Sequence, residues 1–158
     1  MKILSGAFLV AAALPVQAQL IEQKALSMPM ALTIAQTAVE SCKAQGYNVS
    51  VHVLGREGQV LVALRGDGSS PHTFENSLRK AYTARTFKQS SGEFAQRVKD
   101  NPTIGQVHLA NIVATQGGLP ITVGDDVIGG VGVSGAPGGD KDEVCAKAGL
   151  DKVAALLR

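Results

Sequence analysis

The sequence predicts an α+β fold, in which an antiparallel sheet of about five strands carries packed helices. Apolar alternations joined by short glycine turns predict β-hairpins at residues 48–64 and 119–134. Around these hairpins, apolar residues spaced three or four apart predict helices. Because hairpins pair neighbouring strands, we expect the sheet to be antiparallel and the helices to cover it.

The first 18 residues have the pattern of a secretory signal peptide. Met1 and Lys2 give a positive start, residues 3–14 are apolar, and Val16-Gln17-Ala18 is typical of a signal peptidase site. The apolar run is too short for a transmembrane helix, and an uncleaved anchor is the alternative interpretation. No later segment is long and apolar enough to span a membrane. We therefore expect an exported protein, periplasmic or secreted, in which residues 19–158 form one domain.

A helix and a hairpin are predicted next. Apolar residues at four-residue spacing predict a helix from Ser27 to about Gly46, where glycine suits a left-handed cap. Residues 48–54 alternate, with valines on one face and Ser50 and His52 on the other. After a turn, a second apolar run completes the hairpin, and a glycine-rich loop follows it. We expect His52 to be a structural or interface residue.

Two helices are predicted in the middle of the chain. Ser70 and Pro71 suit an N-cap followed by proline at the first helical position, and this helix should run to about Lys88. Its buried stripe is expected to contain Phe74, Leu78, Ala81 and Ala84. Ser90 and Glu93 have the spacing of a capping box, which predicts a second, shorter helix.

Three strands and a helix are predicted to end the chain. Residues 112–115 should form a short strand, and residues 119–123 and 127–134 should form the second hairpin. Asp140 should cap the final helix, with Glu143 at the capping-box position.

The segment Gly129 to Gly135 allows two interpretations. It contains Gly130-x-Gly132-x-x-Gly135, the spacing of a dinucleotide-binding turn. Such a turn follows a strand and opens directly into a helix, whereas these glycines lie within an apolar alternation. We therefore favour a glycine-rich strand over a nucleotide site.

The only two cysteines, Cys42 and Cys145, are predicted to form a disulfide. Export would place them in an oxidising compartment, and both lie on predicted helices that could pack side by side. The bridge would close a loop of about 100 residues. Two buried free thiols are the alternative.

The overall charge is close to neutral, with 15 basic and 13 acidic side chains, so we expect no nucleic-acid binding. The distribution of charge is uneven, because six cations and one anion lie between Arg79 and Lys99.

No nucleophilic triad and no zinc-binding motif is present in the sequence. The role of His108 stays open.

One face of the second predicted helix combines a possible metal ligand, a cation and a hydroxyl. Its residues are His72, Asn76, Lys80 and Thr83. This face could meet an anionic, metal-bearing ligand such as haem, with cations on the propionates and the histidine near the iron. A solvated basic face with a loop histidine is the alternative.

Five segments in order resemble the GlcG/HbpS haem-binding family over nearly the whole chain after the signal. They begin at Arg65 (Arg-Gly-Asp-Gly-Ser), Arg79 (Arg-Lys-Ala-Tyr-Thr-Ala), Gly117 (Gly-Gly-Leu-Pro-Ile), Ile128 (Ile-Gly-Gly-Val-Gly-Val-Ser-Gly-Ala) and Asp142 (Asp-Glu, with Ala148-Gly149 following). The resemblance implies a profilin-like or roadblock-like fold, homo-oligomers, and a tetrapyrrole-type ligand such as haem, which some relatives degrade. Gly55, Gly66 and Ser77 depart from the usual family residues, which affects details of any pocket.

We therefore expect an exported haem-binding protein that acts as a carrier, scavenger or sensor. The expected site has His72 as iron ligand, Arg79 and Lys80 toward the propionates, and Thr83 as a polar neighbour. An enzyme that degrades haem or acts on another small anion is one alternative. A non-catalytic oligomeric interaction module is the other.

Overall fold

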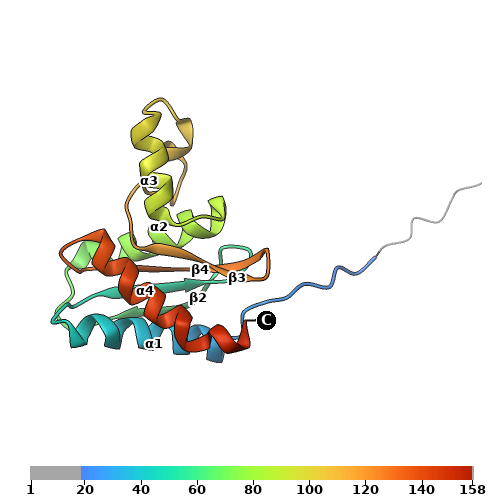
Figure 1. Cartoon of the computed structure of the whole chain (residues 1–158), viewed down its shortest axis with the longest axis horizontal. Helices are drawn as coiled ribbons and strands as arrows, with labels where there is room; N and C mark the ends of the chain where they lie inside the picture. The colour runs from blue at the N-terminus through green and yellow to red at the C-terminus, as the bar shows by residue number, and fades with distance from the viewer. Residues whose placement is uncertain (1–18, 158) are drawn as a thin grey trace, which may run out of the picture.

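The computed structural model describes residues 19–157, whose centre is a four-stranded antiparallel sheet (Figure 1). The strands are β1 (Ser50–Leu54), β2 (Val60–Arg65), β3 (Gly118–Val123) and β4 (Asp126–Ser134). Their order across the sheet is β2-β1-β4-β3. The α+β class and both predicted hairpins are confirmed. The predicted signal peptide, residues 1–18, lies outside the described residues.

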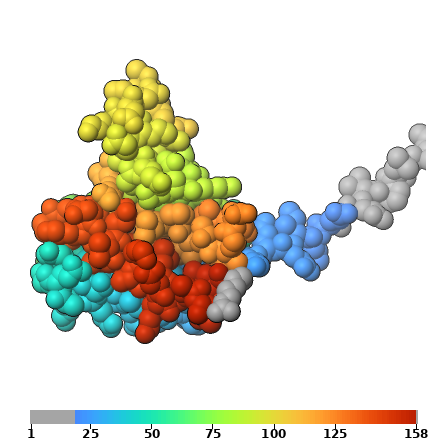
Figure 2. Space-filling view, viewed as in Figure 1, coloured from blue at the N-terminus to red at the C-terminus, as the bar shows by residue number. Residues whose placement is uncertain are grey.

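Helices cover both faces of the sheet and give three layers. α1 (Met28–Ala44) and α4 (Gly139–Val153) pack together on one face, and α2 (Pro71–Phe87) lies on the other (Figure 1). α3 (Ser91–Asp100) and the short helix η1 (Gly105–His108) form an arm that projects beyond α2 (Figure 2). The short helix η2 (Ala154–Leu156) follows α4. None of the helices between residues 19 and 157 is long and apolar enough to cross a membrane.

The prediction of a strand at residues 112–115 is wrong, so the sheet has four strands and not five. The main chain of this segment bonds to side chains of α2. The Thr83 hydroxyl accepts the N–H of Val113 at 2.9 Å and donates to the Val113 carbonyl at 3.3 Å. Arg79 donates to the Ile112 carbonyl at 2.8 Å. Since these side chains satisfy backbone groups of Ile112 and Val113, these two residues need no neighbouring strand.

The glycines of β4 allow α2 to lie directly on the sheet. A Cβ atom at Gly132 would lie 2.1 Å from the Ser77 carbonyl oxygen, and one at Gly130 would lie 2.5 Å from that of Ala81. This close approach also explains an error in the predicted stripe of α2. Ala81 and Ala84 are buried as predicted, but the larger Phe74 is 38% exposed, and Leu78 is half-buried. The glycine spacing therefore serves helix–sheet packing, and β4 does not open directly into a helix.

The helix starts agree with the sequence at α3 and differ at α4. Ser90 and Glu93 form the predicted capping box of α3. The N-cap of α4 is Gly138 and not Asp140, and no side chain caps this helix, so the predicted Asp140–Glu143 capping box is wrong. Asp142, in the first turn, points inward and bonds to other elements.

The predicted disulfide between Cys42 and Cys145 is confirmed. It joins α1 to α4 with a Cα–Cα distance of 5.5 Å, and both cysteines are fully buried. Around it, the main core fills the space between these helices and the sheet. This core includes Ile34, Ala38, Val51, Val53, Val131, Val133 and Ala146.

His52 is a buried structural residue on the opposite face of β1, consistent with its expected role. It is 2% exposed, and its Nδ1 lies 2.8 Å from the Ser77 hydroxyl. Its ring also meets the edge of Phe74 at a centroid distance of 4.5 Å. Ser77, a departure from the family pattern, therefore has a specific partner. Burial lowers the pKa of His52 from 6.5 to about 4.

Acidification should therefore destabilise the fold through His52. Below pH 6.5 the unfolded chain binds a proton at this imidazole, whereas the folded protein stays neutral there until about pH 4. The contribution of neutral His52 to the free energy of unfolding is therefore complete above pH 6.5 and is lost as the pH falls toward 4. Urea unfolding across this range should show a weaker pH dependence in His52→Gln than in wild type. His108→Gln, which changes an exposed histidine, is the control and should keep the wild-type dependence. An identical dependence in His52→Gln would contradict the assignment.

Candidate functional site

The predicted polar face of α2 divides into an outward and an inward part. His72 and Arg79 face outward and, with Glu75 and Asn76, line an open pocket of about 340 Å³. His72 is exposed, and the Arg79 side chain is 38% exposed. The two residues lie seven positions apart, which corresponds to roughly 10 Å along the helix axis. The structure thus brings two of the predicted site residues into one pocket.

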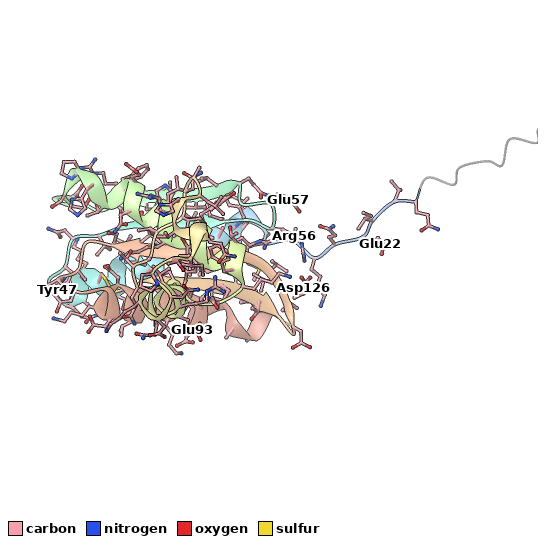
Figure 3. All side chains as sticks on the ribbon, turned by 90° about the horizontal axis from the view of Figure 1, so that it is seen from above. Glu22, Tyr47, Arg56, Glu57, Glu93 and Asp126 are labelled. Carbon is pink, nitrogen blue, oxygen red and sulfur yellow. A yellow bond between two sulfur atoms is a disulfide. The ribbon has the colours of Figure 1, made fainter. Side chains whose placement is uncertain are left out.

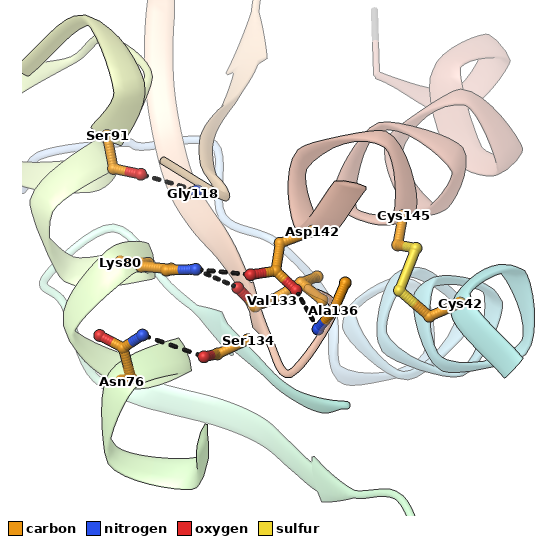
Figure 4. A network of polar contacts seen from close by, with 10 residues as sticks. All are labelled: Cys42, Asn76, Lys80, Ser91, Gly118, Val133, Ser134, Ala136, Asp142 and Cys145. Atoms are coloured by element: carbon orange, nitrogen blue, oxygen red, sulfur yellow. Dashed lines mark hydrogen bonds and ion pairs between the residues drawn. A yellow bond between two sulfur atoms is a disulfide. The ribbon is translucent and has the colours of Figure 1, made fainter. Parts of the chain in front are cut away.

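Contacts to neighbouring segments hold two sides of this pocket, which we call the α2 pocket. One terminal nitrogen of Arg79 donates to the Ile112 carbonyl, and the other lies 3.8 Å from Glu75. The Asn76 amide donates to the Ser134 hydroxyl at 3.0 Å (Figure 4). His72 has no hydrogen-bond partner among residues 19–157. Its imidazole is therefore available to a ligand, while Arg79 and Asn76 are held in place.

Lys80 faces inward, where its ammonium already has partners (Figure 4). The side chain is 3% exposed, and Nζ lies 2.7 Å from the Asp142 carboxylate and 3.1 Å from the Val133 carbonyl oxygen. The second oxygen of Asp142 accepts the N–H of Ala136 at 2.9 Å. Burial raises the pKa of the Asp142 carboxyl, and the adjacent ammonium opposes this shift. This placement does not support the expected role of Lys80 toward propionates.

Gly117 leaves the room that the Lys80–Asp142 ion pair occupies. A Cβ atom there would lie 2.8 Å from Lys80 Nζ and 2.8 Å from the Asp142 Cβ, and the residue has a φ of +122°. Only glycine both lacks a Cβ atom and adopts this positive φ readily.

Thr83 also faces inward, where it binds Val113. Sequence reasoning missed the pairing of Lys80 with Asp142, which are 62 residues apart, although both lie within the five family-like segments.

Several cations of the basic run are occupied within the fold. Arg97 lies over the stacked rings of Phe87 and Phe94, at 5.3 and 5.1 Å from their centroids. Arg85 donates to the Arg56 carbonyl. The run is therefore partly structural, and not one continuous solvated face.

No group of three or more metal-binding side chains occurs in the described part of the chain. The α2 pocket offers one available imidazole and one partly exposed guanidinium. It could hold a metal that arrives with most of its own ligands, as the iron of haem does. It does not supply enough donors to hold a bare ion.

Comparison with known proteins gives a family match that covers most of the chain. Residues 26–151 match the model described as haem-degrading protein HbpS-like. An uncharacterised 15.0 kDa protein of Citrobacter freundii is 35% identical over 131 residues, covering 80% of this chain and 90% of that protein. Protein GlcG of Escherichia coli K12 is 29% identical over 109 residues, covering 69% and 81%.

Solved structures of similar proteins share the fold. A double mutant of HbpS from Streptomyces reticuli is 37% identical, with a TM-score of 0.81, and the match covers 90% of this chain and 98% of that one. A PduOC:heme complex is 25% identical, with a TM-score of 0.74, and the match covers 80% and 93%. The resemblance found in the sequence is therefore confirmed.

Proposed function

The chain belongs to the HbpS-like family of haem-degrading proteins, and we propose that it is an exported haem-binding protein. It would act as a carrier, scavenger or sensor. The observation that carries the proposal is the available imidazole of His72 in a pocket that also contains the Arg79 guanidinium. The similar PduOC:heme complex supports a haem-type ligand for this fold.

The residues of the α2 pocket fit haem better than they fit a free metal ion. A porphyrin supplies four nitrogens to its iron, so a single histidine, His72, would be enough to hold the iron. Arg79 has N–H groups suited to a propionate carboxylate, and its bond to the Ile112 carbonyl holds its position. Bound haem would supply an iron centre whose reactivity depends on the polarity of the pocket.

Lys80 and Thr83 have positioning roles in this proposal. Thr83 holds Val113 and thereby the neighbouring Ile112 carbonyl to which Arg79 donates. Lys80 fixes α2 against the end of β4 and the start of α4. The site that we propose therefore retains His72 and Arg79 as ligand-binding residues.

Hemin titration followed by absorbance tests this assignment. Wild-type protein should give a shifted Soret band, and His72→Ala should weaken hemin binding by about tenfold or more, because the proposed iron ligand is lost. Arg79→Gln should weaken binding less. His108→Ala, which removes another exposed histidine, is the matched control and should bind as wild type does. An unchanged Soret band and affinity in His72→Ala would overturn the site.

The family description favours haem degradation as a second candidate function. Adding ascorbate to the hemin complex in air, which together supply the electrons and the O2 that opening of the porphyrin ring requires, distinguishes the two. Loss of the Soret band with release of a linear tetrapyrrole would identify an enzyme, whereas a persistent band would identify a carrier or sensor.

Export and oligomer formation are further parts of the proposal. The buried disulfide supports an oxidising compartment, in keeping with the signal peptide expected at residues 1–18. A homo-oligomer that binds neither hemin nor a corrinoid would instead favour a non-catalytic interaction module.

A further inference from the structure

A second pocket lies between α3, the segment before β3 and the first turns of α4. Its volume is about 500 Å³, within the range typical of small-molecule sites, and it shares no lining residue with the α2 pocket. Its lining residues are Ser90, Gly92, Glu93, Ala95, Gln96, Lys99, Gln116 and Glu143. We call it the α3–α4 pocket. Figure 3 labels Glu93, which marks its α3 side.

Glu143 gives this pocket an acceptor that the fold does not satisfy. Its Oε2 atom is buried and has no hydrogen-bond partner in the described structure. Leaving a buried carboxylate oxygen unpaired is costly. A rotation of the flexible Glu143 side chain, which lines the pocket, would bring this oxygen to a donor there. The other acid, Glu93, is already engaged, because its carboxylate accepts the Ser90 N–H at 2.7 Å.

Small residues and side-chain stems provide room beside this acceptor. The pocket contains Gly92 and Ala95, and the Gln116 side chain packs so closely on α3 that a Cβ at Gly92 would lie 2.9 Å from its Cγ. Gln96 donates its amide N–H to Asp100 at 2.8 Å, which leaves its amide oxygen as a second acceptor. The site thus combines an unpaired carboxylate oxygen, an amide oxygen and short apolar surfaces.

The charges of the lining favour a monovalent cation. Two carboxylates and the ammonium of the exposed Lys99 give a net charge of −1. We propose that the α3–α4 pocket binds a small organic ammonium, whose N–H groups donate to Glu143 and to the Gln96 amide oxygen. Its carbon chain would lie against Gly92, Ala95 and the stem of Gln116. This site is separate from the proposed haem site and does not depend on it.

Titration with n-butylammonium chloride, followed by calorimetry and by ¹H–¹⁵N NMR spectra, tests the proposal. Wild-type protein should bind the amine and shift the amide signals of Gly92, Gln96 and Gln116. n-Butanol and butyrate, which lack the positive charge, should not bind. Glu143→Gln should lower the affinity by about tenfold or more, because a neutral amide oxygen accepts from an ammonium more weakly than a carboxylate does. Glu40→Gln, which removes the same charge from an exposed position on α1, should bind as wild type does.

Three results would overturn this site. The first is the absence of amine binding to the wild-type protein, and the second is equal binding of n-butanol and n-butylammonium. The third is unchanged affinity in a Glu143→Gln variant whose NMR spectrum shows a folded protein. Hemin titration of Glu143→Gln should give the wild-type Soret shift, so failure of this proposal and failure of the haem proposal are distinguishable.

Discussion

Replacing Cys42 and Cys145 together by alanine should lower the free energy of unfolding by about 4 kcal/mol. The bridge links residues 103 positions apart. In the chain-entropy model a loop of that size contributes up to about 4.7 kcal/mol, because the cross-link restricts the unfolded chain. Urea unfolding followed by circular dichroism measures the difference. The urea dependence should also become steeper, since the unfolded chain without the bridge exposes more surface.

Reduced wild-type protein is the control for the alanine variant. It lacks the bridge but keeps both sulfur atoms in the core, so it separates the effect of the cross-link from that of the small cavities. We expect both forms to fold, because α1 and α4 also pack closely elsewhere: a Cβ at Gly149 would lie 2.5 Å from the Ile34 carbonyl oxygen. A loss below about 1 kcal/mol in both forms would contradict the entropic account.

The helices, the hairpins and the disulfide could be predicted because their signals are local or compositional. Caps, alternation and glycine turns lie within short windows, and two cysteines allow only one intramolecular pairing. The strand prediction at residues 112–115 failed because a strand needs a partner, and no short window shows where the backbone groups bond. In this segment they bond to Thr83 and Arg79.

The placement of the candidate site residues could be predicted only in part, for a similar reason. Helical spacing predicted that His72, Lys80 and Thr83 lie on one face of α2. Spacing does not show which positions of that face are covered by other segments of the chain. The segment at Val113 covers Thr83, and α4 supplies Asp142 to Lys80. Of the four predicted ligand-binding residues, His72 and Arg79 remain accessible in the α2 pocket. Tertiary contacts between distant residues therefore decided which polar residues of this face stay available to a ligand.

Breaking the Lys80–Asp142 ion pair should have an effect of similar size to loss of the disulfide. Both side chains are almost fully buried, so removing one charge leaves the other without compensation, at a cost of about 3–5 kcal/mol. Asp142→Asn keeps an oxygen for the Ala136 N–H while removing the charge, and Lys80→Met keeps a chain of similar length. The double variant has neither charge, so its loss in unfolding free energy should be smaller than the sum of the losses in the two single variants.

The exposed pair Lys147–Asp151 provides a matched control for these urea-unfolding measurements. Its nitrogen–oxygen distance is 2.6 Å, similar to the buried pair, but its side chains are more than 60% exposed. Removing Asp151 should therefore change the free energy of unfolding by at most about 0.5 kcal/mol. If breaking either pair changed the free energy of unfolding by the same amount, burial would not be the cause of the large loss expected at Lys80–Asp142.

The same variants decide what Lys80 does in the proposed haem site. If Lys80 positions α2, Lys80→Met should lower stability strongly, and the folded fraction should still bind hemin through His72 and Arg79. If Lys80 instead contacted a propionate, Lys80→Met would weaken hemin binding with little loss of stability. The burial of Lys80, which is only 3% exposed, and its distances of 2.7 and 3.1 Å to Asp142 and Val133 favour the first outcome. To reach a ligand at the surface, the buried ammonium would have to leave both partners. Leaving them would strand the Asp142 carboxylate in a buried place, which is the same cost that the single variants measure.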